Sequence, residues 1–197
     1  MNNLLWVLCL ILLIGVAPVF AHPHVFVDSK IKVVFNERGL AGIHNRWVFD
    51  ELYSTAMASS GDADGDGKIS ATENDWFYKT IMAPNQEKNY FNYVLLGSKF
   101  VKISRLDNFK ASLQGSRLVL EFDAKFEIPV TADYTMFVVV VSDPTNYIQM
   151  TTDMENADVD APDELDVDFF DDGLDGLVLF RSFVFAPQGL FLRFKKK

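Results

Sequence analysis

Most of this chain consists of short β-rich runs separated by tight turns, and this pattern restricts its fold more than any other feature. Valine, isoleucine and aromatic residues are frequent in the runs, and apolar side chains often alternate with polar ones. The runs are 25–35, 40–49, 91–96, 99–104, 109–113, 117–128, 134–142, 146–152, 177–186 and 190–195, with turns at 36–39, 97–98, 114–116 and 187–189. Successive short strands with tight turns predict an antiparallel sandwich or barrel. We expect a mainly β (α+β) fold, with an antiparallel β-sandwich-like domain.

One segment departs from the β pattern and predicts two helices. Residues 50–60 carry apolar side chains at helical spacing, and Asp50 is a plausible N-cap. Residues 71–82 continue in the same way, and Pro84 should end the second helix. We therefore expect an EF-hand-like helix–loop–helix, inserted between early strands at about 50–83.

The loop between these helices, DADGDGKISATE, matches the EF-hand calcium loop over residues 62–73. Calcium takes about six to eight oxygen ligands, and this spacing wraps oxygens around one point. Gly67 stands where the loop needs a sharp turn. The expected ligands are Asp62, Asp64, Asp66 and Glu73 through carboxylates, Lys68 through its carbonyl and Ser70 through its hydroxyl. A single loop in an exported protein predicts a Kd of about 10⁻⁴ to 10⁻³ M and a structural Ca²⁺. The alternative is an Asp-rich turn that matches by chance.

The first 21 residues are expected to be a signal peptide. Their apolar run is shorter than the about 20 residues of a membrane span, and Val19 and Ala21 suit a cleavage site after Ala21. Residues 22–197 would then form one β-rich domain in the periplasm. The single cysteine, Cys9, lies in this leader without a lipidation motif, so we expect no lipid anchor. The alternative is an uncleaved anchor in the inner membrane, with the domain facing the periplasm.

The charge balance excludes some partners. The formal net charge is −9 at pH 7, which disfavours nucleic acid and anionic lipid surfaces and attracts cations. Carboxylates are dense over residues 153–175, where Lys and Arg are missing. This stretch is either a solvated loop followed by a strand or a patch that attracts cations or docks a partner.

Two of the three histidines stand at the predicted start of the mature chain. In a strand, His22 and His24 project to the same face, where two imidazoles can hold zinc, nickel, cobalt or copper. The carboxylates of residues 28, 50, 51 and 143 are candidates to complete such a site. The alternative is a strand whose histidines hydrogen-bond to their neighbours, and His44 is expected to be such a structural histidine.

Enzyme signatures are missing from the sequence. It has no GxSxG, no HExxH and no phosphate-binding glycine loop. We expect a protein without catalytic activity.

Four segments together resemble a bacterial periplasmic family of unknown function, the domain of unknown function 1007. They are HPHVFVD, RWVFDELYS, DADGDGKIS and SDPTNY, and the resemblance covers roughly residues 21–155. That family is often labelled a periplasmic component of an ABC-type transport system and is often encoded near nickel/cobalt-type exporters. The resemblance implies a periplasmic location and a role in metal handling, with an inner-membrane metal transporter as partner.

These observations lead to two hypotheses. In the first, the protein is a periplasmic metal-binding accessory protein of a transition-metal transport system, with a structural calcium site. In the second, it is a calcium-stabilised envelope interaction module that binds no transition metal and docks a partner through its acidic face.

Overall fold

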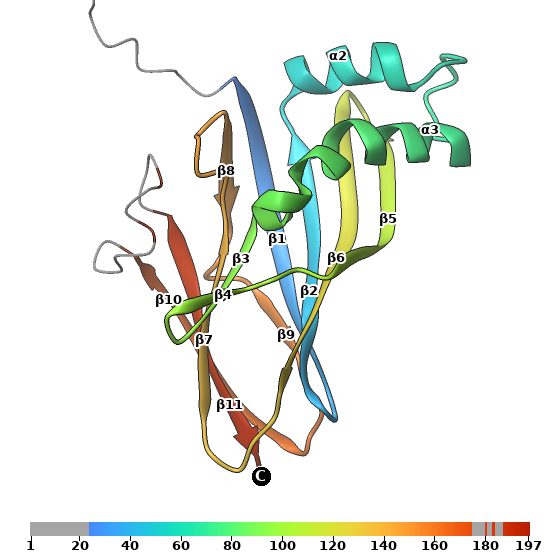
Figure 1. Ribbon diagram of the computed structural model, residues 1–197. Coiled ribbons are helices and arrows are strands. Elements are labelled where there is room, and N and C mark those ends of the chain that lie inside the picture. The colour runs from blue at the N-terminus through green and yellow to red at the C-terminus, as the bar shows by residue number, and fades with distance from the viewer. Residues whose placement is uncertain (1–23, 175–179, 181–182, 184–186) are drawn as a thin grey trace, which may run out of the picture.

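The computed structural model describes residues 24–174, 180, 183 and 187–197, which form two β-sheets with helices at one end (Figure 1). The six-stranded sheet has the order β5–β6–β2–β1–β8, and β9 also pairs with β1. Its strands are β1 (Val25–Asn36), β2 (Gly39–Phe49), β5 (Arg105–Gln114), β6 (Arg117–Pro129), β8 (Ile148–Thr152) and β9 (Asp158–Asp160). The five-stranded sheet has the order β10–β11–β7–β3–β4. Its strands are β3 (Asn92–Leu96), β4 (Lys99–Val101), β7 (Thr135–Val141), β10 (Leu165–Gly173) and β11 (Gln188–Lys196). The predicted mainly β (α+β) class is confirmed.

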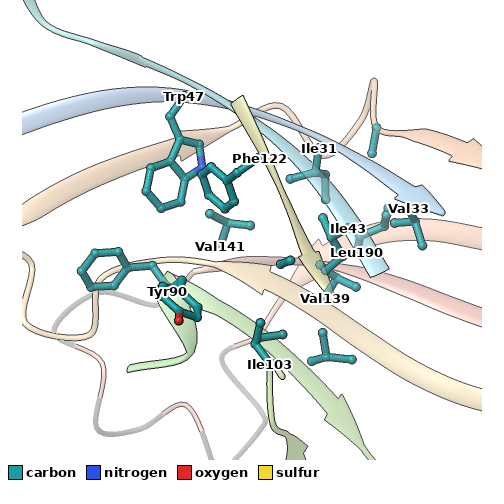
Figure 2. Close-up of a cluster of buried hydrophobic side chains, with 14 of the residues drawn as sticks. Ile31, Val33, Ile43, Trp47, Tyr90, Ile103, Phe122, Val139, Val141 and Leu190 are labelled. Carbon is teal, nitrogen blue, oxygen red and sulfur yellow. The ribbon is translucent and has the colours of Figure 1, made fainter. Parts of the chain in front are cut away.

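The inner faces of the two sheets share one hydrophobic core. The ring of Phe35 in β1 lies 6.4 Å from that of Phe137 in β7 and 5.1 Å from that of Phe194 in β11. Figure 2 shows Trp47 and Phe122 of the six-stranded sheet directed toward Val141 of the other sheet. Full burial of each such side chain contributes about 1.5–3 kcal/mol. The alternating strands therefore bury one face each in a sandwich.

The strand pairing is not wholly antiparallel, so this part of the prediction is wrong. β1 pairs with β8 and with β9 in parallel. The chain leaves β7 in one sheet and enters β8 in the other beside the start of β1, where the carbonyl of Tyr147 accepts bonds from the N–H groups of His24 and Val25. Parallel neighbours need such a crossover, which no local turn signal predicts.

The helical insert consists of α2 (Glu51–Gly61) and α3 (Ala71–Phe77), followed by further helical turns. Pro84 does not end the second helix as predicted. A π-helix (Tyr78–Met82) and a 3₁₀ helix (Ala83–Phe91) follow α3 directly. Pro84 stands in the first turn of the 3₁₀ helix, where a missing N–H is tolerated. In the part of the chain that the structure describes, no helix is both long and apolar enough to span a membrane.

Several predicted strand limits also need correction. β4 ends at Val101, before the predicted limit of 104. β5 begins at Arg105 rather than at residue 109, and a bulge with Asn108 at φ 54° interrupts the alternation that would have marked its first residues. The predicted turn at 187–189 is wrong, since Gln188 and Gly189 lie in β11 and pair with β10. Most of the predicted strand 177–186 lies outside the described residues.

Side-chain hydrogen bonds attach both helices to the six-stranded sheet. The buried Ser54 hydroxyl in α2 accepts a bond from the N–H of Leu118 in β6 at 2.8 Å. The Asn74 amide in α3 accepts from the N–H of Ala111 at 2.7 Å and donates to the carbonyl of Phe109 at 3.2 Å, both in β5. β5 is an edge strand, so the backbone groups on its outer side have no partner strand. Asn74 supplies hydrogen bonds to two of these groups.

Candidate metal centre

The loop between α2 and α3 brings three of the predicted calcium ligands together. One carboxylate oxygen from each of Asp62, Asp64 and Asp66 lies within 4.8 Å of the others. Gly65 and Gly67 adopt φ values of 70° and 75°, which glycine reaches without steric cost. Among the described residues, these three form the group of acidic, histidine or cysteine side chains compact enough to hold a metal ion.

Hydrogen bonds within the loop hold all three of these carboxylates. Asp62 accepts bonds from the N–H groups of Gly65 and Gly67, both at 3.0 Å. Asp64 accepts from the N–H of Asp66 at 3.2 Å. Asp66 in turn accepts from the N–H of Lys68 at 2.7 Å, and these bonds turn the side chains back over the loop. Three carboxylates held this close repel one another, and a cation between them would relieve that repulsion.

Glu73 lies outside this group and closes the loop in another way. One of its carboxylate oxygens accepts a bond from the N–H of Ala63 at 2.7 Å, and the other accepts from the N–H and hydroxyl of Ser70 at 2.8 and 2.7 Å. Ser70 is the N-cap of α3, and the pair forms a capping box. The predicted ligands Ser70 and Glu73 therefore lie next to the three aspartates but are hydrogen-bonded to each other.

These bonds predict how the loop responds to acid. The N–H of Ser70, its hydroxyl and the N–H of Ala63 hold the pKa of Glu73 below its ordinary value of 4.5. The folded state thus binds this proton less readily than the unfolded chain. Its contribution to stability is complete above pH 4.5 and is lost as the pH falls through the lowered pKa. Urea unfolding from neutral pH to below this range should show a smaller loss of stability for Glu73→Gln than for the wild type. An equal loss in both proteins would contradict the prediction.

Of the predicted histidine pair, only His24 is among the described residues, and His22 lies outside them. His24 is exposed at the start of β1, with its ring 5.3 Å from that of Tyr147. Among the described residues, His24 belongs to no group of three metal-binding side chains.

The carboxylates that were candidates to complete the histidine site have other partners. Asp28 pairs with Arg117 at 2.8 Å, and Glu51 accepts a bond from the Ser116 hydroxyl at 3.1 Å. Asp143 is 6% exposed. It accepts bonds from the N–H and hydroxyl of Thr145 and from the N–H of Ile148, at 2.9, 2.8 and 3.1 Å.

Asp50 connects the strand of His24 to the helical insert. Its carboxylate accepts bonds from the N–H of Phe26 at 2.8 Å and from the N–H of Tyr53 at 2.9 Å, as the predicted N-cap of α2. Burial raises the pKa of Asp50, but the N–H groups of Phe26, Tyr53 and Leu52 outweigh it and hold the pKa below its ordinary value. Together with the bond of the His24 N–H to Tyr147, this places residues 24–28, RWVFDELYS and SDPTNY at one end of the sheet.

His44 has the structural role that the sequence predicted. Its Nδ1 lies 2.8 Å from a carboxylate oxygen of Asp123 in the neighbouring strand. The other oxygen of Asp123 accepts a bond from the side chain of Asn108 at 2.7 Å. The carboxylate is therefore satisfied within the sheet.

Comparison with known proteins agrees with the resemblance found in the sequence. A family model described as "Protein of unknown function (DUF1007)" matches residues 7–169. A protein of Haemophilus influenzae named "Uncharacterized protein" is 28% identical over 137 residues, which cover 68% of this chain and 64% of that protein. The family match contains the acidic loop, the start of β1 and the turn before β8, and it ends within β10. Because the match covers most of its length, the chain belongs to this family of unknown function.

Proposed function

We propose that this protein is an exported metal-binding accessory protein whose loop 62–73 holds a structural calcium ion. The observation that carries the proposal is the cluster of Asp62, Asp64 and Asp66 oxygens within 4.8 Å of one another. Two oxygens bound to one calcium ion at about 2.3–2.6 Å lie at most about 5 Å apart, so the cluster has the size of a calcium coordination sphere. The remaining oxygens would come from the Lys68 carbonyl, Ser70 and Glu73.

The packing of the helices supports a structural role for the ion over a sensing one. Sensor EF-hands open their helix pair when calcium binds. Here Gly61 at the end of α2 lies so close to α3 that an added Cβ would stand 2.5 Å from the Phe77 ring and 2.6 Å from the Trp76 ring. Ser54 and Asn74 also tie each helix to a strand. Opening would break these contacts, so calcium would hold the closed arrangement.

The transition-metal part of the proposal rests on the histidines and on the family. His22 and His24 would hold zinc, nickel, cobalt or copper in the periplasm, as part of an inner-membrane metal transport system. His24 is exposed, and its backbone is fixed by Tyr147, so its ring can meet a ligand from solvent. The second candidate function is a calcium-stabilised interaction module, which an exposed apolar surface on the five-stranded sheet favours.

Calcium titration tests the main proposal. By calorimetry the wild type should bind calcium with a Kd of about 10⁻⁴ to 10⁻³ M, and its Tm should rise with calcium and fall with a chelator. Asp64→Asn/Asp66→Asn should abolish both effects, because it removes two of the clustered charges. Asp163→Asn/Asp171→Asn changes the same number of exposed carboxylates outside the loop and should bind as the wild type does. Equal binding in both double variants would contradict a loop site.

The histidine site needs a protein with an authentic N-terminus. Expression with the native leader and an intact mass would establish whether His22 is the first residue. Zinc, nickel, cobalt and copper would then be titrated against the wild type and His22→Ala/His24→Ala. Micromolar binding that this variant loses would support metal handling. Calcium binding alone, unchanged in the variant, would favour the interaction module.

A further inference from the structure

The outer face of the five-stranded sheet carries a second apolar layer. One row of apolar residues crosses all five strands, each residue paired with the next on the neighbouring strand. The row consists of Phe170 in β10, Phe191 in β11, Val138 in β7, Leu95 in β3 and Phe100 in β4. The rings of Phe170 and Phe191 stack at 5.1 Å with 5° between their planes. An antiparallel sheet with one solvated face would carry polar residues along such a row. We therefore expect this apolar row to be shielded from water by other residues or by a partner.

Described residues between β10 and β11 cover one half of the row. The ring of Phe180 lies 5.4 Å from that of Phe100, and the ring of Phe183 lies 5.2 Å from that of Tyr93. Leu174 joins the same cluster, in which Leu95 and Val138 are buried. The half near β3 and β4 is thus packed.

The half near β10 stays open in the part of the chain that the structure describes. Met136 is 67% exposed and Phe170 is 60% exposed. A cavity of about 510 Å³ lies here, lined among others by Leu95, Met136, Val138, Phe170, Phe191 and Arg193. Exposed apolar patches with a polar rim mark interaction sites.

The border of this cavity is an edge strand with a strong charge. β10 ends the order of the five-stranded sheet, so one side of its backbone has no partner strand among the described residues. Asp168 pairs with Arg193 at 2.7 Å and Asp166 with Lys195 at 4.0 Å. Asp171 and Asp172 have no cationic partner among the described residues. Pairing β10 with a second copy of itself would bring two strongly acidic strands side by side, which is unfavourable.

We propose that β10 and the adjoining cavity bind an extended segment of a partner protein in which basic and apolar side chains alternate. The segment would add a strand to the free side of β10, a known mode of peptide recognition. Its apolar side chains would enter the cavity beside Met136 and Phe170, and its lysines or arginines would project from the opposite face of the added strand, beside Asp171. In Figure 1, β10 lies on the other side of the molecule from the loop between α2 and α3, and no residue of this surface belongs to either candidate metal site, so the proposal does not depend on them.

A synthetic ten-residue peptide that alternates lysine with leucine and valine is the probe. Calorimetry should detect binding to the full mature chain, and hydrogen exchange at the amides of 165–173 should slow. A peptide with glutamate in place of lysine, and one with N-methylated backbone amides, should bind at least about tenfold more weakly. These two controls separate the charge from the strand pairing.

Variants of the protein locate the surface. Phe170→Ser and Asp171→Lys/Asp172→Lys should each weaken binding at least about tenfold. Both changes are at exposed positions, so the fold should persist. Phe26→Ser, which removes an exposed aromatic ring from the other sheet, and Glu87→Lys/Glu155→Lys should bind as the wild type does.

Three outcomes would overturn the proposal. The first is equal binding of the lysine and glutamate peptides, or of wild type and Phe170→Ser. The second is concentration-dependent dimerisation that Phe170→Ser abolishes, which would assign the surface to a second copy. The third is binding to phosphatidylglycerol vesicles that requires Phe170, which would assign it to a membrane.

Discussion

Replacing Phe77 with alanine should lower the free energy of unfolding by about 3–5 kcal/mol. Phe77 is fully buried at the end of α3 and belongs to the core that both sheets share. Its ring also lies against Gly61 of α2 and edge-on to Trp76 at 5.1 Å. The substitution would leave a cavity at the point where the two helices and the sandwich meet. Urea unfolding monitored by tryptophan fluorescence measures the loss.

A control substitution in the same helical insert shows whether the loss of stability comes from the buried packing of Phe77 or from any truncation in the insert. Leu52 in α2 is 81% exposed, so Leu52→Ala should change the free energy of unfolding by about 0.5 kcal/mol or less. The Phe77 variant should also bind calcium more weakly, since α3 begins beside the loop. Equal destabilisation by the two variants would mean that the insert does not pack as the structure describes.

Local signals in the sequence predicted much of the sandwich. Alternation located β1, β2 and β6. The predicted turn at 97–98 forms with Gly97 at a φ of 61°. The predicted turn at 114–116 forms at 115–116, with Gly115 at a φ of 62°, since Gln114 still belongs to β5. The parallel pairing of β1 with β8 and β9 was missed. It depends on where the chain crosses between sheets, and no residue near β8 carries that information.

The helical segment shows how tertiary packing overrides a local rule. Proline often marks the end of a helix, but helical turns continue past Pro84 up to a kink at Lys88–Tyr90. Tyr90 is buried at a φ of 51°, so burial offsets the cost of an unusual conformation. Sequence periodicity cannot predict this balance.

The candidate metal centre was predictable only in part, because some of its contacts lie within one loop and others join residues far apart in the sequence. The spacing of Asp62, Asp64 and Asp66 lies within one loop, and the structure brings these carboxylates together. The role of Glu73 was ambiguous in the sequence, because the same residue completes a calcium loop and a capping box with Ser70. Asp50 bonds to Phe26, and Asn74 bonds to β5. These bonds join residues 24 or more positions apart, and no sequence motif predicts them.

Replacing Asp143 with alanine should cost about 3 kcal/mol of stability, which is large for a residue in a turn. Its buried carboxylate accepts three bonds, and its loss would leave the N–H of Ile148 without a partner near the core. This turn also presents the Tyr147 carbonyl to His24 and Val25. The starts of β1 and β8 should therefore loosen together, and hydrogen exchange at Val25 and Ile148 should become faster.

A less buried carboxylate provides the control for this prediction. Asp153 accepts bonds from the N–H and side chain of Asn156 at 3.3 and 3.0 Å. Asp153→Ala should therefore cost about 1 kcal/mol or less and leave exchange at Val25 unchanged. If the turn positions His24 for a metal, Asp143→Ala should also weaken transition-metal binding, whereas calcium binding should stay as in the wild type. Loss of calcium binding in the Asp143 variant would show instead that this turn and the calcium loop unfold as one unit.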